Sequence, residues 1–126
     1  MATRSDRRLR IKAQIILGDE IAMGPGKAEL LEWIQKTGSI TAAARSMGLS
    51  YRRAWLMLDA MNRTFAAPVV ETSHGGAKGG GAHLSASGVA VLAAFRALEA
   101  DLAEAAKPHQ LALLAALART VTPPRS

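Results

Sequence analysis

The sequence contains no cysteine, and only 4% of its 126 residues are aromatic. The first absence excludes disulfides, thiol catalysis and thiolate metal sites together. The second means that the core must consist mainly of Ala, Leu, Ile, Val and Met. No apolar run approaches the ~20 residues that span a bilayer, and the N-terminal segment lacks the apolar stretch of a secretory signal. We therefore expect a cytoplasmic protein with no membrane segment.

The sequence also lacks a constellation of catalytic residues. Glu29 and Glu32 fall on the outside of an expected helix, where carboxylates are usually solvated charges. The glycine-rich segment around Lys78 is not a Walker A phosphate loop, because Gly79 stands where Ser or Thr must follow the lysine. The histidines are too scattered for a metal site: they are His74, His83 and His109. We expect that the protein is not an enzyme and that it has neither catalytic residues nor a bound metal.

Positive charge, by contrast, is abundant. The formal net charge is +6, and the isoelectric point of the sequence is about 10.5. This balance favours a polyanionic partner, either nucleic acid or an acidic membrane surface. The basic residues gather at the N-terminus and between Arg45 and Lys78, whereas the segment after Ser85 is nearly balanced. One part of the chain is therefore expected to face the polyanion, and another part has a different task.

The first half of the chain predicts one strand followed by three helices. In residues 10–17 apolar and polar residues alternate, as in a short strand. One face of this strand would carry Ile11, Ala13 and Ile15. A turn-rich stretch follows and leads to Pro25, where a helix can begin. The expected helices cover, in order, residues 25–38, 40–47 and 51–67.

The second half predicts a hairpin followed by two helices. Short β-branched segments at 69–73 and 82–85 are joined by a glycine-rich tip, which is typical of a hairpin. A long helix then extends to about Lys107, and we expect Pro108 to break it. Residues 109–120 form a short last helix. The predicted fold class is mainly α with a small β-hairpin, an α+β architecture.

Residues 38–62 carry the main functional signal. Two helices that are separated by a tight turn containing Gly48 are typical of a helix-turn-helix. Ser50 is expected to cap the second helix, and its exposed first turn holds Tyr51, Arg52 and Arg53. In this motif that turn meets base edges in the major groove, where Arg bonds guanine through O6 and N7. The alternative is that the two arginines belong only to a solvated face.

Two further segments fit contact with a DNA backbone. Ser39 and Thr41, at the start of the preceding helix, are placed to touch phosphate with hydroxyls and free amides. The hairpin follows the recognition helix directly, as a wing does. Its Lys78 and free glycine amides can lie against phosphates, and His74 and His83 flank the tip. The alternative for the hairpin is a flexible surface loop.

Residues 38–88 closely resemble the N-terminal DNA-binding domain of the ModE family, the molybdate-responsive transcriptional regulators. The segments that carry the resemblance are GSITAAARSMGLSYRRAW, LDAMN, APVVET and GGAKGGGAHLSASG. LysR-type regulators have a similar domain. The resemblance implies a winged helix-turn-helix dimer that binds a palindromic operator in double-stranded DNA. The start of the recognition helix at Ser50 and the wing at Lys78 match the family by position.

The resemblance also bears on ligands and domains. Members of the family continue into C-terminal domains that hold the oxyanion, whereas this sequence ends at Ser126. We therefore expect no cofactor, and the alternative is that this chain senses molybdate. The expected domains are a basic flexible tail at 1–9, a winged helix-turn-helix at 10–88 and a helical dimerisation segment at 89–120.

The long C-terminal helix is the expected dimer element. Its apolar residues follow 4-3-4 steps from Val91 onward, and this spacing forms a seam that can pack on a partner. The residues expected at the interface between two copies are Phe95, Leu98, Leu102 and Leu114. The alternative is that the stripe covers the domain's own core, and this applies most to Leu84 and Val91.

Three functions stay open from the sequence. The first is a sequence-specific regulator, which the arginines at the start of the recognition helix favour. The second is a molybdate- or oxyanion-binding adaptor that does not read sequence. The third is a protein-interaction module that uses the C-terminal helices.

Overall fold

A computed structural model describes residues 6–73, 81–119 and 123–124. The chain divides into two compact units. The larger unit covers residues 12–98, and the terminal unit combines residues 1–11 with residues 99–126. The long helix α4 (Ala86–Ala115) contributes to both units.

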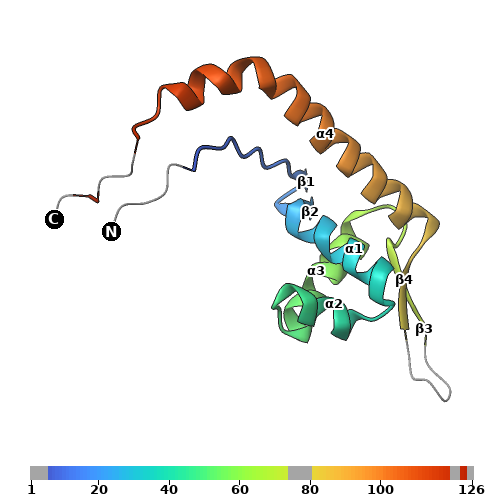
Figure 1. Cartoon of the computed structure of the whole chain (residues 1–126). Helices are drawn as coiled ribbons and strands as arrows, with labels where there is room; N and C mark the ends of the chain where they lie inside the picture. Colours follow the sequence, from blue (N-terminus) through green and yellow to red (C-terminus); the bar gives the residue numbers. More distant parts are fainter. Residues whose placement is uncertain (1–5, 74–80, 120–122, 125–126) are drawn as a thin grey trace. The chain divides into compact units, whose positions relative to one another are not determined.

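The larger unit contains two small antiparallel hairpins and three helices, followed by the first part of α4. The elements before α4 are β1 (Ile15–Leu17), β2 (Glu20–Met23), α1 (Pro25–Thr37), α2 (Ile40–Met47), α3 (Tyr51–Thr64), β3 (Val70–Ser73) and β4 (Gly81–Leu84). Figure 1 shows β3 and β4 running side by side next to α1. The predicted α+β winged helix with a long C-terminal helix is confirmed.

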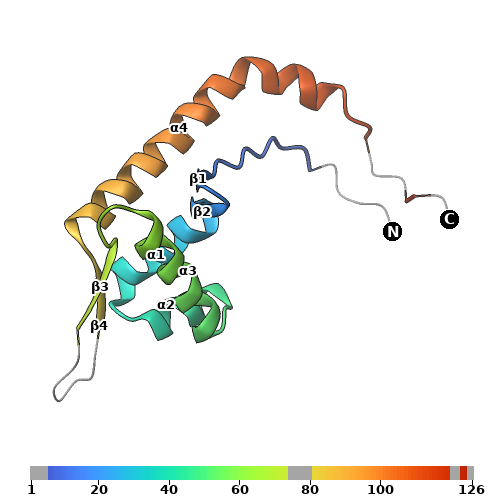
Figure 2. The same cartoon turned by 180° about the vertical axis from the view of Figure 1, so that it is seen from behind.

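The core lies between α1, α2 and α3. Leu30, Leu31 and Ile34 of α1 are fully buried. Small side chains let α2 and α3 approach each other, because Ala43, Ala44 and Ala54 are also buried. Figure 2 shows the two helices from behind. The tight packing holds the start of α3 in a fixed place.

Local sequence explains where α2 and α3 begin and end. The Oγ atom of Ser39 accepts a hydrogen bond from the Ala42 amide at 3.1 Å, and the Oγ atom of Ser50 accepts one from the Arg53 amide at 3.0 Å. Gly48 ends α2 in the left-handed region with a φ of 69°, which glycine adopts without steric cost. The cap at Ser50 and the turn at Gly48 were predicted, and both are confirmed.

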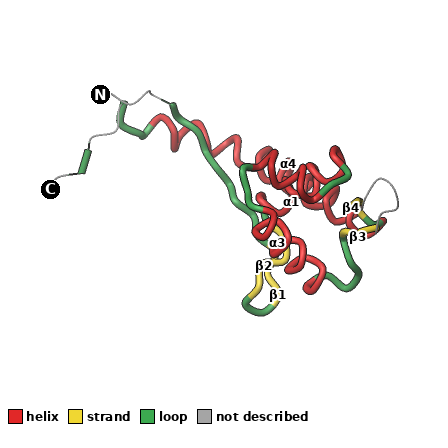
Figure 3. Tube along the Cα trace, turned by 90° about the horizontal axis from the view of Figure 1, so that it is seen from below, coloured by secondary structure: helices red, strands yellow, loops and turns green. Residues whose placement is uncertain are grey.

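The expected strand over residues 10–17 is wrong in its length, and its partner strand was missed. Only Ile15–Leu17 form β1, which pairs with β2 across a turn at Gly18 and Asp19. Gly18 takes a φ of 60°, as a two-residue hairpin loop requires. Residues 10–14 have no partner strand because the chain turns into α1 directly after β2. Figure 3 shows the two hairpins of the larger unit as separate structures.

The expected break at Pro108 is also wrong, because α4 continues through it to Ala115. A proline within a helix removes one hydrogen bond and costs about 3 kcal/mol. Here the bond that is lost would have joined residue 108 to the carbonyl of Glu104. Ala- and Leu-rich sequence on both sides favours the helix strongly enough to continue it. Leu84, which was placed in the seam of the long helix, lies in β4 instead.

In the terminal unit, the N-terminal segment contacts the last turns of α4. The guanidinium of Arg7 donates hydrogen bonds to the carbonyls of Leu114 at 3.3 Å and Ala118 at 3.4 Å. Ala118 follows the end of α4, and the carbonyl of Leu114 in the last turn also accepts the amide of Leu117 at 3.2 Å. Leu9 and Ile11 line a small groove with Leu102 and neighbouring residues of α4. None of the helices in the described part of the chain combines the length and apolar character that crossing a bilayer requires.

Candidate nucleic-acid interface

The start of α3 presents the residues that were expected to read DNA. Tyr51 is 53% exposed, and Arg52 and Arg53 are exposed beside it. Neither arginine side chain forms a hydrogen bond or ion pair with a residue that the structure describes. The Ser50 cap holds the turn rigid while leaving both guanidinium groups free to bind a ligand. This turn can therefore offer ten N–H donors to an acceptor-rich partner, five from each guanidinium.

The start of α2 lies on the same unit and is partly exposed. Ser39 uses its oxygen as the helix cap, so its hydroxyl proton remains available as a donor. The side chain of Thr41 is exposed, and it makes no hydrogen bond within the described ranges. Both residues therefore retain donors of the kind that bind phosphate oxygens.

The wing is described at its base. The register of β3 and β4 pairs Val70 with Leu84 and Ser73 with Gly81. His83 approaches Glu71 across the strands, with 3.6 Å between Nε2 and Oε1. His74 and Lys78, which were expected to contact DNA from the tip, lie outside the described residues.

Asn62 of α3 fixes the base of the wing, a role that the sequence did not reveal. Its Oδ1 atom accepts hydrogen bonds from the amides of Val69 at 2.8 Å and Val70 at 3.3 Å. Its Nδ2 atom donates to the carbonyl of Val70 at 3.2 Å. The signal was present, because Asn62 ends the LDAMN segment, but only the fold shows its partner. The wing is thereby tied to the recognition helix.

A second contact joins the wing to the turn between α1 and α2. The amide of Ala82 in β4 donates to the carbonyl of Gly38 at 2.9 Å. Gly38 takes a φ of 69°, which turns its carbonyl out of α1. The wing base is therefore fixed to both ends of the helix-turn-helix segment.

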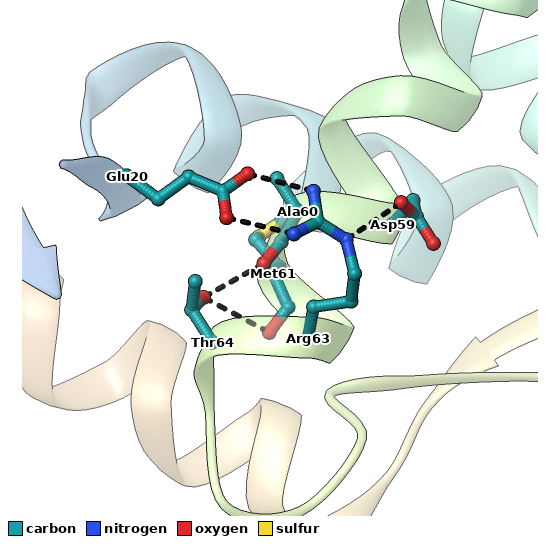
Figure 4. A network of polar contacts seen from close by, with 6 residues as sticks. All are labelled: Glu20, Asp59, Ala60, Met61, Arg63 and Thr64. Atoms are coloured by element: carbon teal, nitrogen blue, oxygen red, sulfur yellow. Dashed lines mark hydrogen bonds and ion pairs between the residues drawn. The ribbon is translucent and has the colours of Figure 1, made fainter. Parts of the chain in front are cut away.

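Arg63 belongs to the basic middle of the chain but is committed to a structural network (Figure 4). Its guanidinium donates to both carboxylate oxygens of Glu20, at 2.7 and 2.6 Å, and to Asp59 at 2.8 Å. These hydrogen bonds raise the pKa of Arg63 and lower the pKa of Glu20 from their ordinary values. The network fastens the β1–β2 hairpin to the end of α3 and removes Arg63 from the set of free cations.

The residues expected at a dimer interface are divided between the units. Phe95 is buried in the core of the larger unit, whereas Leu98 is 37% exposed. Leu98 lines an apolar groove of about 250 Å³ together with Ile15, Phe65 and Val91. Leu102 and Leu114 are half-buried in the terminal unit. Within the described ranges, no group of three or more His, Asp or Glu side chains is placed to hold a metal ion.

Comparison with known proteins gives several relatives, although no family model matches. The molybdenum-pterin-binding protein MopB of Rhodobacter capsulatus is 50% identical over 82 residues, which are 65% of this chain and 30% of MopB. The transcriptional regulator ModE of Haemophilus influenzae is 32% identical over 108 residues, 86% of this chain and 40% of that protein. The DNA-binding transcriptional dual regulator ModE of Escherichia coli is 36% identical over 72 residues, 57% of this chain and 28% of that protein.

The helix-turn-helix and the hairpin that follows it define the larger unit as a winged helix-turn-helix domain. The relatives then indicate the family. The chain is similar to ModE regulators and to a ModE-like Mop protein, as expected of a ModE-type N-terminal domain, which confirms the resemblance seen in the sequence. It spans 28–40% of the length of these three relatives.

Proposed function

We propose that this chain is a sequence-specific DNA-binding transcriptional regulator that binds a palindromic operator as a dimer. The observation that carries the proposal is the exposed first turn of α3, where Arg52 and Arg53 have no side-chain partner in the described part of the chain. In a helix-turn-helix this turn enters the major groove. Each arginine then bonds guanine O6 and N7, which specifies the base pair.

The names of two relatives support the same role. One is a transcriptional regulator, and the other is a DNA-binding transcriptional dual regulator. We extend DNA binding and regulation to this chain, in the cytoplasm and without catalytic activity. Ser39 and Thr41 hold phosphates beside the recognition helix. His74 and Lys78 contact the backbone from the wing.

Dimerisation is supported by the apolar surface of α4. Leu98 is exposed at the apolar groove of the larger unit, and Leu111 is 79% exposed. Residues 10–88 bind DNA in this proposal, residues 89–120 include the surface that pairs with a second copy, and residues 1–9 form a basic tail. A two-fold dimer places its two recognition helices about 34 Å apart, which is one turn of the duplex.

The test is selection of duplexes from a random-sequence pool by the full chain, followed by binding titrations with the selected duplex. Arg52→Ala and Arg53→Ala each remove a base-reading group, so each loses about 1–3 kcal/mol of discrimination between bases. Lys107→Ala is the control. Lys107 also carries a positive charge, but it pairs with Glu104 on α4 and lies outside residues 10–88, which bind DNA in this proposal. The control retains the selected sequence.

Two results contradict the proposal. One is equal binding of all duplexes at physiological salt, and the other is an unchanged preference in both arginine variants. The name of MopB raises the competing function of binding a molybdenum compound. A thermal shift with molybdate, together with no duplex preference, favours that function instead.

A further inference from the structure

A groove of about 370 Å³ lies between the start of α2, the first turns of α3 and the base of the wing. Its walls carry hydroxyl and aromatic side chains, and none of the residues that line it is charged. The residues that matter here are Ser39, Thr41, Tyr51, Trp55, Thr72 and Ser73. The expected interface included the first three of these residues and not the last three.

Trp55 is the most unusual residue of this groove. The sequence contains two tryptophans, and Trp55 is 47% exposed although its ring is large and apolar. Trp55 lies four residues after Tyr51, so both rings project from the same face of α3. Its indole N–H has no hydrogen-bond partner among the described residues. A large aromatic surface with a free donor is suited to a ligand that is apolar on one part and accepts hydrogen bonds on another.

The opposite wall comes from β3. Thr72 and Ser73 are exposed, and their hydroxyls donate to no described residue. The two walls are held at a fixed separation, because the Ala82 amide bonds the Gly38 carbonyl at 2.9 Å. A Cβ atom at Gly81 would lie 3.3 Å from that same carbonyl, so the strand approaches the turn as closely as glycine allows. The groove is therefore formed before a ligand arrives.

Resting on the proposed function, we propose that this groove holds a sugar–phosphate segment of one DNA strand. The hydroxyls of Ser39, Thr41 and Thr72 donate to phosphate oxygens, and Trp55 packs against the adjoining deoxyribose. Short neutral donors are common phosphate contacts, and they fix the register of a protein on the duplex without reading its sequence. The absence of an acidic lining residue removes electrostatic repulsion of the strand. Trp55, Thr72 and Ser73 thus join the interface as positioning residues.

Fluorescence tests the position of Trp55 directly. In Trp33→Phe, Trp55 is the sole tryptophan, and in Trp55→Phe the sole tryptophan is Trp33, which stacks on Lys36 at 4.9 Å. Binding of a fluorescein-labelled duplex from the selected pool is followed independently by anisotropy. We expect bound duplex to protect Trp55 from acrylamide quenching and to leave the quenching of Trp33 unchanged.

Affinity gives a second readout. Thr72→Val and Trp55→Ala each weaken duplex binding by about three- to tenfold, the loss expected from one contact. Neither change removes a charge, so the slope of affinity against salt concentration stays the same. Ser46→Ala is the matched control, because Ser46 is exposed on α2 outside the groove. Circular dichroism and the milder Trp55→Phe separate a lost contact from a lost fold.

The outcomes separate this inference from the proposed function. If anisotropy reports binding while Trp55 stays accessible to acrylamide, or Thr72→Val binds as tightly as the parent chain, the groove does not hold the strand and the regulator proposal stands. If the parent chain binds no duplex, both fail. Protection of Trp55 together with an unchanged salt slope supports the groove.

Discussion

Asn62 and Val70 are joined by two hydrogen bonds, one in each direction. The Nδ2 atom of Asn62 donates to the carbonyl of Val70 at 3.2 Å, and the amide of Val70 donates to Oδ1 at 3.3 Å. The same oxygen accepts the amide of Val69, a residue with no exposed surface. One side chain of the recognition helix therefore forms hydrogen bonds with three backbone groups at the point where the wing begins.

Asn62→Ala is expected to destabilise the chain by about 1–3 kcal/mol, because it leaves buried backbone groups without partners. Urea unfolding followed by circular dichroism measures the change. Gln35→Ala, an exposed substitution on α1, is the control and changes stability by less than about 0.5 kcal/mol. Equal stability of the two variants would show that the wing base does not depend on Asn62.

Two glycines within helices are predicted to respond in opposite directions to the same substitution. A Cβ atom at Gly88 of α4 would lie 2.0 Å from the carbonyl oxygen of Val69, so Gly88→Ala forces the backbone apart and destabilises the fold. At Gly26 of α1, a Cβ atom would meet only the end of Met57, at 3.8 Å. Gly26→Ala therefore stabilises the fold by about 0.4–1 kcal/mol, through the entropy of the unfolded chain.

Thermal unfolding of the two alanine variants side by side checks this pair. Because both changes add one methyl group to a helix, a difference in sign isolates the contact with Val69. A Gly88→Ala variant as stable as the parent chain would mean that α4 does not begin against the start of the wing.

Local chemistry explains which parts of the fold could be predicted. The caps at Ser39 and Ser50 and the turn at Gly48 depend on neighbours within a few residues, so the sequence alone indicates them. The role of Asn62 depends on residues seven and eight positions away, and that of Trp55 on a groove completed by the wing. Such partners are known only after the chain has folded.

Two errors of the sequence-based prediction, at the first strand and at Pro108, have physical causes of the same kind. The β1–β2 hairpin contains only three and four residues per strand, too few for a clear alternating pattern. The helix at Pro108 continues because the flanking sequence compensates for one lost hydrogen bond. In each case a local rule was outweighed by its context, and neither error affects the start of α3.

Acid is expected to weaken the contact between Glu32 of α1 and Arg96 of α4. Hydrogen bonds from the Arg96 guanidinium, at 2.6 and 3.1 Å, lower the pKa of Glu32 below its ordinary 4.5. A carboxylate with a lowered pKa in the folded state stabilises the fold above the unfolded pKa, and this contribution is lost as pH falls through the folded pKa. The loss therefore begins near pH 4.5 and continues below it.

Glu32→Gln removes this dependence. The variant is less stable than the parent chain at neutral pH, and the difference is less than about 1 kcal/mol because the pair is partly exposed. In acid the stabilities of the variant and the parent chain become equal. Urea midpoints measured from pH 7 to pH 3 provide the comparison. Glu29→Gln is the control, because Glu29 is exposed on the same helix without an ion pair to any described residue. A constant difference across the pH range would exclude the pair as its cause.

Leu98→Lys is expected to convert the proposed dimer into a monomer without unfolding it. Leu98 lines the apolar groove and is already 37% exposed, so a charge there disfavours pairing more than folding. Val89→Lys introduces the same charge nine residues earlier on α4. At this spacing the side chain lies on the opposite side of the helix from Leu98 and faces away from the groove. Val89 is 47% exposed, so its variant controls for the added charge and retains the dimer.

Sedimentation equilibrium gives the mass of both variants, and titration with the selected palindrome gives their affinity. A monomer contacts one half-site at a time, so Leu98→Lys loses affinity for the palindrome and retains its affinity for an isolated half-site. If the parent chain is already a monomer, or if Leu98→Lys remains a dimer, then the groove beside Ile15 and Phe65 is not the pairing surface. The contribution of α4 to operator binding would then have to come from the terminal unit, where Leu111 and its apolar neighbours are exposed.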